Sequence, residues 1–188
     1  MILAIDTSAE QCAVALAGGA APIVLTRQME RGHAETLMPM IAEVIGGDTA
    51  GITRVAVCTG PGSFTGLRIG IAAARGLALG LGVPCIGVTR LEALASASGV
   101  CDVVLPSRAG RIIRQSFRDG VALSEPMIIL DHDGAEESSP GLVDPLRLAE
   151  IAAGRSEAEL PKPLYLRGPD AALPREAPPV LLDEICPR

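Results

Sequence analysis

TGPGSFTGLRIG, residues 59–70, separates a short apolar run from a long segment rich in Ala, Gly and Leu. This pattern predicts a buried strand at 55–59, a glycine loop, and a helix at 67–82 that is apolar nearly all round. Backbone N–H groups at the start of such a helix can hold an anion, because the helix dipole favours negative charge there. The glycines can equally form a tight turn that lets the helix lie close to a sheet. The spacing leaves both interpretations open.

The familiar phosphate and nucleophile motifs do not fit this loop. Gly60 and Gly66 are six residues apart, and Leu67 stands where a Walker A loop has its lysine. Ser63 lacks the flanking glycines of the G-x-S-x-G nucleophile elbow. A Rossmann fingerprint requires a third glycine at the position that Thr65 occupies. That fingerprint also follows the first strand of a domain, whereas this loop follows the fourth predicted strand. The loop is therefore predicted to be a strand–loop–helix junction of another kind.

The first hundred residues are predicted to alternate between strands and helices. Apolar runs predict strands at 2–6, 12–17, 22–27 and 85–88, and helical spacing predicts helices at 34–45 and 91–98. Pro39 is expected to kink the first helix or to mark its early turns. Gly70, Gly76 and Gly80 would each cost about 1 kcal/mol inside the 67–82 helix, so close backbone packing is expected there. A strand meander that continues into α/β crossovers is the repeating half of the actin-like ATPase fold.

The rest of the chain repeats this pattern in a shorter form. Strands are predicted at 102–106, 111–118 and 126–130, a polar acidic loop at 131–141, a helix at 145–154 and an extended segment at 162–169. We therefore expect an α/β fold in three parts: an N-terminal subdomain at 1–100, a shortened second subdomain at 101–169 and a Pro-rich tail at 170–188.

Composition and charge argue against several classes of function. The 188 residues carry a net charge of −6 without the basic cluster that a protein gripping nucleic acid by itself needs. The two histidines, His33 and His132, lie far apart and outside any metal motif, so no metal site is predicted. The N-terminus lacks the basic region of a signal peptide, and Arg68 and Arg75 interrupt the most apolar stretch. We expect a cytoplasmic protein with no membrane span.

The polar residues near the predicted strand ends allow more than one interpretation. Asp6 is either a magnesium or phosphate residue or a turn-former. A triad can be drawn from Ser63, His33 and Asp6, but almost any chain offers such a triple. His33 is expected to be a helix cap or surface residue, and no catalytic residue is predicted.

Four segments resemble one family, TsaB (also called YeaZ). They are MILAIDTSAEQCAVAL (1–16), RGHAETLMPMIAEVI (31–45), TGPGSFTGLRIGIAAARGLALGLGVPCIGVTRLEALA (59–95) and PLYLR (163–167). The resemblance is continuous over the first half of the chain and patchy afterwards. It implies an actin-like (ASKHA, ribonuclease H-like) fold with an intact N-terminal half and a reduced second half.

The resemblance also implies a function. TsaB proteins are non-catalytic subunits of the bacterial complex that forms N6-threonylcarbamoyladenosine next to the anticodon of tRNAs reading ANN codons. The expected partners are a TsaD-like catalytic subunit in a heterodimer, a TsaE-like ATPase, and a second copy of the chain when TsaD is absent. Transfer RNA is expected only through the complex. The chain itself would require no cofactor, whereas ATP and a metal are expected on the partner subunits.

Carried onto this chain, the resemblance assigns two groups of residues. The vestigial phosphate-loop residues are Asp6, Thr7, Ser8, Gly60, Gly62, Ser63, Thr65 and Gly66. The partner interface, on helices 34–45 and 66–81, comprises His33, Glu35, Leu37, Ile41, Val44, Ile45, Arg68, Ile71, Arg75 and Leu79. The apolar residues of the first helix can face either the partner or the core, because both arrangements require the same spacing.

The second half departs from the family pattern D-A-R-x-x-E-V-Y. In PSRAGRIIRQSF (106–117), Pro106 replaces the acid and Arg111 the glutamate. Ile113 replaces the tyrosine, and only Arg108 is kept. Two rival functions are an ATP-hydrolysing enzyme of the same fold and a metallopeptidase. The first would need a second phosphate loop after residue 101, and the second would need a histidine pair.

Overall fold

The computed structural model describes residues 1–131, 141–156 and 159–166. Its helices and strands, in chain order, are β1 (Ile2–Asp6), β2 (Gln11–Ala17), β3 (Ile23–Gln28), α1 (His33–Ile45), β4 (Arg54–Cys58), α2 (Phe64–Leu81), β5 (Cys85–Val88), α3 (Arg90–Leu94), β6 (Val100–Pro106), β7 (Arg111–Arg118), β8 (Val121–Ala122), β9 (Met127–Leu130) and α4 (Pro145–Ala153). The predicted strands and helices are found in the predicted order, but α3 is shorter than the expected 91–98 helix, and the short strand β8 was not predicted.

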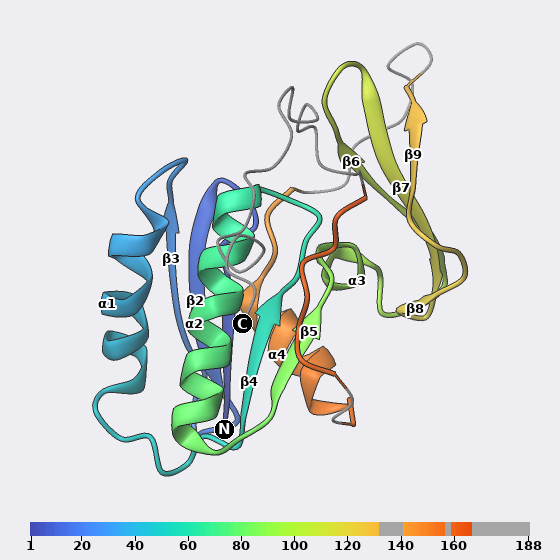
Figure 1. The fold of residues 1–188 in the computed structure, drawn as a ribbon. Helices are drawn as coiled ribbons and strands as arrows, with labels where there is room; N and C mark the ends of the chain where they lie inside the picture. Colours follow the sequence, from blue (N-terminus) through green and yellow to red (C-terminus); the bar gives the residue numbers. More distant parts are fainter. Residues whose placement is uncertain (132–140, 157–158, 167–188) are drawn as a thin grey trace, which may run out of the picture.

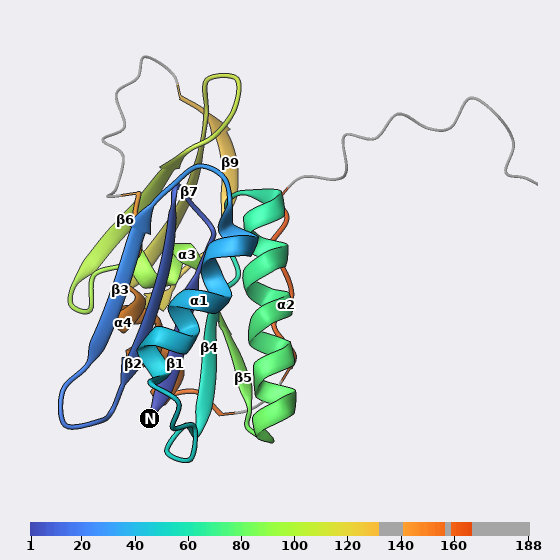
Figure 2. The same cartoon turned by 90° about the vertical axis from the view of Figure 1, so that its left-hand side faces the viewer.

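The N-terminal half is built on a five-stranded sheet with the order β3-β2-β1-β4-β5. The first three strands form an antiparallel meander, and β4 and β5 continue it in parallel. Helices α1 and α2 cover one face of this sheet, and α4 covers the other (Figures 1 and 2). This part of the molecule therefore has a helix layer, a sheet and a second helix layer.

Alternation along the strands decides which side chains fill each layer. Leu3 and Ile5 of β1 point into the core beneath α1 and α2, whereas Ala4 between them points toward α4. On β4, Val57 points into the core beneath α1 and α2, and Ala56 points toward α4. Side chains on a strand point alternately to opposite faces, so an unbroken apolar run is what a sheet covered on both sides requires.

Helix α1 begins after Gly32 and ends at Gly46, and both glycines adopt the left-handed conformation. Pro39 lies inside the helix, on its exposed side. Helix α2 begins at the Ser63 cap, whose hydroxyl accepts the N–H of Gly66, and ends at the left-handed Gly82. By length and composition α2 could cross a membrane, but a core helix passes the same test, and α2 packs on the first sheet.

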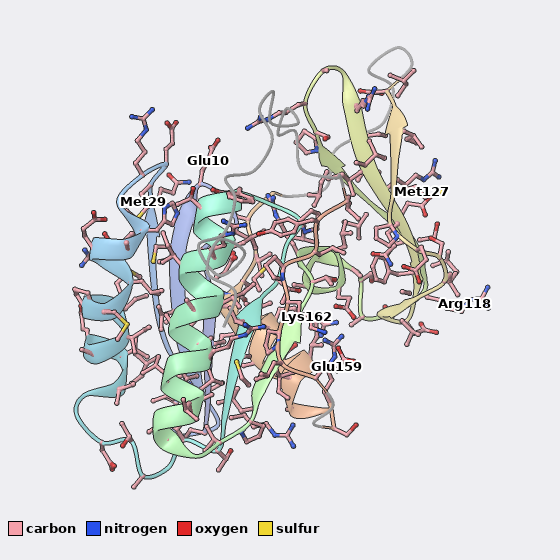
Figure 3. The ribbon with its side chains drawn as sticks, viewed as in Figure 1. Glu10, Met29, Arg118, Met127, Glu159 and Lys162 are labelled. Atoms are coloured by element: carbon pink, nitrogen blue, oxygen red, sulfur yellow. The ribbon has the colours of Figure 1, made fainter. Side chains whose placement is uncertain are left out.

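The second half forms a separate antiparallel sheet in which β6 pairs with β7, and β7 pairs with both β8 and β9. It lies beyond α3 on the β5 side of the first sheet (Figure 1). Its core is a cluster around Leu91, Leu105 and Phe117. Arg118 and Met127 lie on the side of this sheet farthest from α1 (Figure 3).

Helix α4 follows the second sheet in sequence but packs on the first. Its Leu148 and Ala152 join the core that contains Ala4 and Ala56. Arg54 on β4 donates to the carbonyl of Ala152 over 3.2 Å. This helix, which the sequence analysis places in the 101–169 subdomain, therefore packs as part of the first layered unit. The predicted 170–188 tail lies outside the described residues.

Candidate functional site

Two chain segments meet at the carboxyl ends of β1 and β4. These strands are parallel neighbours, so the turn after β1 and the glycine loop after β4 emerge at the same edge of the sheet. Gly60 has a φ of 96°, a conformation that other residues rarely adopt, and its bond to Pro61 is cis. The predicted phosphate-loop residues therefore do come together in space.

Asp6 is fully buried, and both of its carboxylate oxygens have partners within the chain. One accepts the backbone N–H of Ser8 over 2.9 Å, and the other accepts the side-chain amide of Gln11 over 2.9 Å. The same Gln11 amide donates to the carbonyl of Val143 over 2.8 Å. Asp6 therefore orders a turn and connects it to the segment before α4, which favours the turn-former over the magnesium or phosphate interpretation.

Thr7 and Ser8 are bound to the glycine loop. The Thr7 hydroxyl donates to the carbonyl of Gly66 over 2.7 Å, and the N–H of Ser63 donates to the carbonyl of Ser8 over 2.8 Å. The Cys58 thiol donates to the Ser8 hydroxyl over 3.3 Å, and burial raises the pKa of this thiol well above its ordinary value. The two segments are thus joined by hydrogen bonds.

Glycine is required at three positions where these segments touch. A Cβ at Gly62 would overlap the carbonyl of Ser8, and one at Gly66 would overlap the carbonyl of Thr7. A Cβ at Gly70 would overlap the Thr7 hydroxyl, which confirms the close packing expected at that glycine. Because protein atoms fill the contact, the loop geometry favours the tight-turn interpretation over an anion held between the two segments. Thr65 is exposed outside this contact.

The triad drawn from Ser63, His33 and Asp6 is not supported by the hydrogen bonds. The Nε2 atom of buried His33 lies 3.1 Å from the carbonyl of Gln11. The Ser63 hydroxyl caps α2, and Asp6 is paired as described above. Within the described part of the chain no cluster of His, Cys, Asp or Glu could hold a metal ion, and His132 lies outside it.

Part of the predicted partner interface is corrected by the structure. Leu37, Ile41 and Val44 on α1 are only 1–2% exposed, and Ile71 on α2 is 4% exposed. Their side chains pack against the first sheet, so they form core and leave no surface for a partner. The helical spacing of the apolar residues on α1 was consistent with either a core or a partner surface, and their burial assigns them to the core.

The remaining predicted interface residues differ in exposure. His33 is buried and no side chain caps α1, so the expectation of a helix cap or surface residue was wrong. Ile45 and Arg75 are half-buried. Arg75 donates to the carbonyl of Pro161. The exposed members are Glu35, Arg68 and Leu79, and Leu79 is 85% exposed.

A cleft of about 940 Å³ that the sequence analysis missed lies between the glycine loop and the second sheet. It is lined by Phe64 and Arg68 at the start of α2, by Arg90 and Arg108, and by Tyr165 from the PLYLR segment. Composition was the only hint in the sequence that these residues matter. The chain has one tyrosine and two phenylalanines, and the tyrosine and one of the phenylalanines line this cleft. Nothing in the sequence placed residues from such distant segments together.

Comparisons with known proteins give consistent results. The family model for TsaD, tRNA N6-adenosine threonylcarbamoyltransferase, matches residues 2–111. The tRNA threonylcarbamoyladenosine biosynthesis protein TsaB of Haemophilus influenzae is 39% identical over 100 residues, which are 52% of this chain and 42% of that protein. The TsaB protein of Escherichia coli is 41% identical over 100 residues, 52% of this chain and 43% of its own length. The matched part thus spans less than half of these two relatives.

Two further comparisons extend over most of the chain. An uncharacterized protein of Mycobacterium tuberculosis is 30% identical over 200 residues, covering 90% of this chain and 93% of its own. The crystal structure of YeaZ from Pseudomonas aeruginosa superposes with a TM-score of 0.69 and 25% identity, covering 88% of this chain and 99% of that one. Together with the sheet order, these matches confirm the actin-like fold. The chain belongs to the TsaB (YeaZ) family, whose fold is related to that of TsaD.

Proposed function

We propose that this chain is a non-catalytic scaffold subunit in the formation of N6-threonylcarbamoyladenosine on tRNA, and that it acts by binding a TsaD-like subunit in the cytoplasm. The names of its TsaB relatives, which describe biosynthesis of this nucleoside, support the pathway. ATP and a metal belong on the partner subunits, which include a TsaE-like ATPase, and tRNA binds only through the complex. The buried, internally paired Asp6 and Thr7 support a structural role for the former phosphate loops.

The observation that carries the proposal is the outer face of α1 and α2, which we call the helix face. Exposed positions four residues apart form one row on each helix: Ala34, Met38 and Ala42 on α1, and Ala72, Gly76 and Gly80 on α2. The side chains of Met38 and Leu79 are 48% and 85% exposed. The helix face thus combines small residues with two large apolar side chains.

Gly76 and Gly80 lie on the exposed side of α2. Each costs about 1 kcal/mol relative to Ala inside a helix. A Cβ added at either glycine meets nothing within 4 Å, so neither supports close packing within the described part of the chain, contrary to expectation. Small residues in rows four apart allow another helix to approach closely with ridges packed into grooves. A partner helix on the helix face would account for both glycines.

The proposal is tested by mixing the chain with the TsaD-like protein of the same organism and looking for a co-eluting complex in size-exclusion chromatography. Leu79→Asp and Gly76→Arg are expected to abolish co-elution while the monomer keeps its circular dichroism spectrum. Both positions are open, so neither change should disturb folding. Leu123→Asp is the matched control, because Leu123 is 52% exposed in the second half, and it should leave the complex intact.

Three results would contradict the proposal. The first is the absence of a complex between the unmodified proteins. The second is a complex that survives both helix-face variants, which would place the interface elsewhere. The third is hydrolysis of ATP or of a peptide by the isolated chain, which would favour the ATPase or the metallopeptidase alternative.

A further inference from the structure

Strand β9 leaves one edge of the second sheet free. It pairs with β7 on one side, and no strand of the described residues lies on its other side (Figure 1). The N–H of Asp131 donates to the carbonyl of Gly110 over 3.0 Å, which fixes the alternation of hydrogen bonds along this antiparallel pair. Ile129 therefore bonds to β7, whereas Ile128 and Leu130 direct their N–H and C=O groups outward. Within the described segments these outward groups have no hydrogen-bond partner.

The other edges of the two sheets carry features that prevent further pairing. Arg27 lies on β3 and Asp102 on β6, and β8 has only two residues. The edge of β5 is followed by residues 159–166 (Figure 1). Charge, shortness and covering are ways in which proteins protect sheet edges. Strand β9 has the sequence MIIL, without a charge, and its Met127 and Leu130 side chains are 55% and 54% exposed. In the part of the chain that the structure describes, the edge of β9 is thus open to another strand.

The chain after α4 already covers one sheet edge and then approaches β9. Residues 159–166 run beside β5, and the N–H of Leu164 donates to the carbonyl of Thr59 over 2.8 Å. Leu166 packs on the same core cluster as Ile128 of β9. The last described residue therefore lies on the same core as the strand whose edge is free, and residues 167–188 continue from that point.

We propose that residues 180–186 of the same chain cover this edge as an additional strand of the second sheet. Their sequence, VLLDEIC, contains no proline, is bounded by Pro179 and Pro187, and is longer than the four residues of β9. Four of the seven residues are Val, Leu or Ile. The thirteen residues 167–179 can span about 40 Å when extended, which is ample to reach the edge from Leu166.

An added strand would supply what the free edge lacks. Its backbone would give partners to the outward N–H and C=O groups of β9, as in β-strand addition by extended peptides. Charge favours the antiparallel direction, because a parallel strand would bring Asp183 and Glu184 beside Asp131. The contact lies in the second sheet, away from α1 and α2, so the inference goes beyond the proposed scaffold role.

A second copy of the chain is the competing occupant, and two arguments disfavour it. Antiparallel pairing of two β9 strands would bring Glu125 of one copy toward Asp131 of the other, and like charges across a strand pair are destabilising. Segment 180–186 is also attached to the sheet through its own chain, which gives it an effective concentration of roughly millimolar. A second copy at micromolar concentration would be outcompeted.

The experiment measures amide hydrogen exchange by NMR in the full chain and in a Leu181→Pro/Leu182→Pro variant. Consecutive strand residues point their N–H groups to opposite sides, so one of the two prolines removes an N–H that faces β9 in any register. We expect the amides of Ile128 and Leu130 to exchange at least about tenfold faster in this variant. The amide of Ile129 bonds to β7 and should exchange at the same rate in both proteins.

A matched control places the same two substitutions outside the proposed strand. Ala171→Pro/Ala172→Pro alters only the connecting residues 167–179, so Ile128 and Leu130 should keep the protection of the parent. Circular dichroism and thermal melting establish that each variant is folded. Measurements at several protein concentrations separate the chain's own segment from a second copy, because protection by the chain's own segment does not depend on concentration.

Four results would overturn the proposal. The first is exchange at Ile128 and Leu130 that is as fast in the parent as in the Leu181→Pro/Leu182→Pro variant. The second is protection that rises with protein concentration and survives that variant, which would identify a second copy. The third is an equal loss of protection in the control, and the fourth is an equal loss at Ile129, which would mean that β9 itself is lost. None of these results involves the helix face, so failure here leaves the scaffold proposal standing.

Discussion

Replacing glycine by alanine at two positions of α2 should have opposite effects on stability. At Gly66 the new Cβ would overlap the Thr7 carbonyl, which belongs to the backbone and cannot rotate away. Overpacking of this kind costs about 1–3 kcal/mol. The shift needed to relieve it would also weaken the hydrogen bond from the Thr7 hydroxyl to Gly66, a loss of about 1 kcal/mol. The helix-propensity gain of up to about 1 kcal/mol offsets part of this cost.

The net expectation is that Gly66→Ala lowers the free energy of unfolding by about 1–3 kcal/mol, with a central value near 2 kcal/mol. In a chain of this size a loss of about 2 kcal/mol corresponds to a drop of about 4–8 °C in the melting temperature. At Gly76 the Cβ meets nothing within 4 Å. Only the propensity gain of about 1 kcal/mol then remains, so Gly76→Ala should raise the melting temperature by about 2–4 °C.

Urea denaturation followed by circular dichroism, at a protein concentration where the chain is monomeric, measures both changes. Gly66→Ala protein as stable as the parent would refute the reasoning, because it would mean that the two segments have free space between them. A Gly76→Ala variant less stable than the parent would mean that something within the monomer covers that glycine.

Three further changes test other parts of the structure. Thr89→Ala removes the hydroxyl that accepts the N–H of Glu92 in the capping box of α3. The free energy of unfolding should fall by about 1 kcal/mol, and an unchanged value would show that the cap contributes nothing. Ile41→Asp places a carboxylate at a core position, so circular dichroism should show an unfolded chain. A native spectrum would mean that Ile41 lies at the surface. Burial raises the pKa of Cys12 and of Cys85 from the ordinary value of 9.0 to about 11. At Cys12 the negative charge of Asp6 adds a smaller effect in the same direction. The unfolded chain therefore loses these protons first, so the contribution of the two thiols to stability should be constant below about pH 9 and be lost as pH rises to about 11. A free energy of unfolding, measured in urea, that stays flat between pH 9 and 11 would contradict the assignment.

The layered first half could be predicted because its pattern is local. Apolar runs such as 2–6 and 55–59 specify strands, and their continuous apolar character predicts burial on both faces. Leu37, Ile41 and Val44 recur at helical spacing and do lie on the buried side of α1. The sequence could not decide between core and partner for them, because an apolar stripe has the same period whichever surface covers it.

The sequence could not predict which segments far apart in the chain lie together in the fold. Helix α4 was grouped with the second sheet because it follows that sheet in the chain, yet Leu148 packs on the first sheet. Arg68 and Tyr165 are 97 residues apart and come together only because the PLYLR segment returns to the glycine loop, where Leu164 donates to the carbonyl of Thr59 over 2.8 Å. No spacing rule connects such segments, so the cleft was visible only in three dimensions.

The glycines of α2 serve two different purposes on two sides of one helix. On the inner side, Gly66 and Gly70 allow the helix to rest on Thr7. On the outer side, Gly76 and Gly80 leave the backbone open. Because the inner contact uses protein atoms alone, the orientation of the helix face does not depend on a nucleotide between the loops. A surface fixed in this way is preorganised, so a partner helix would not have to order it on binding.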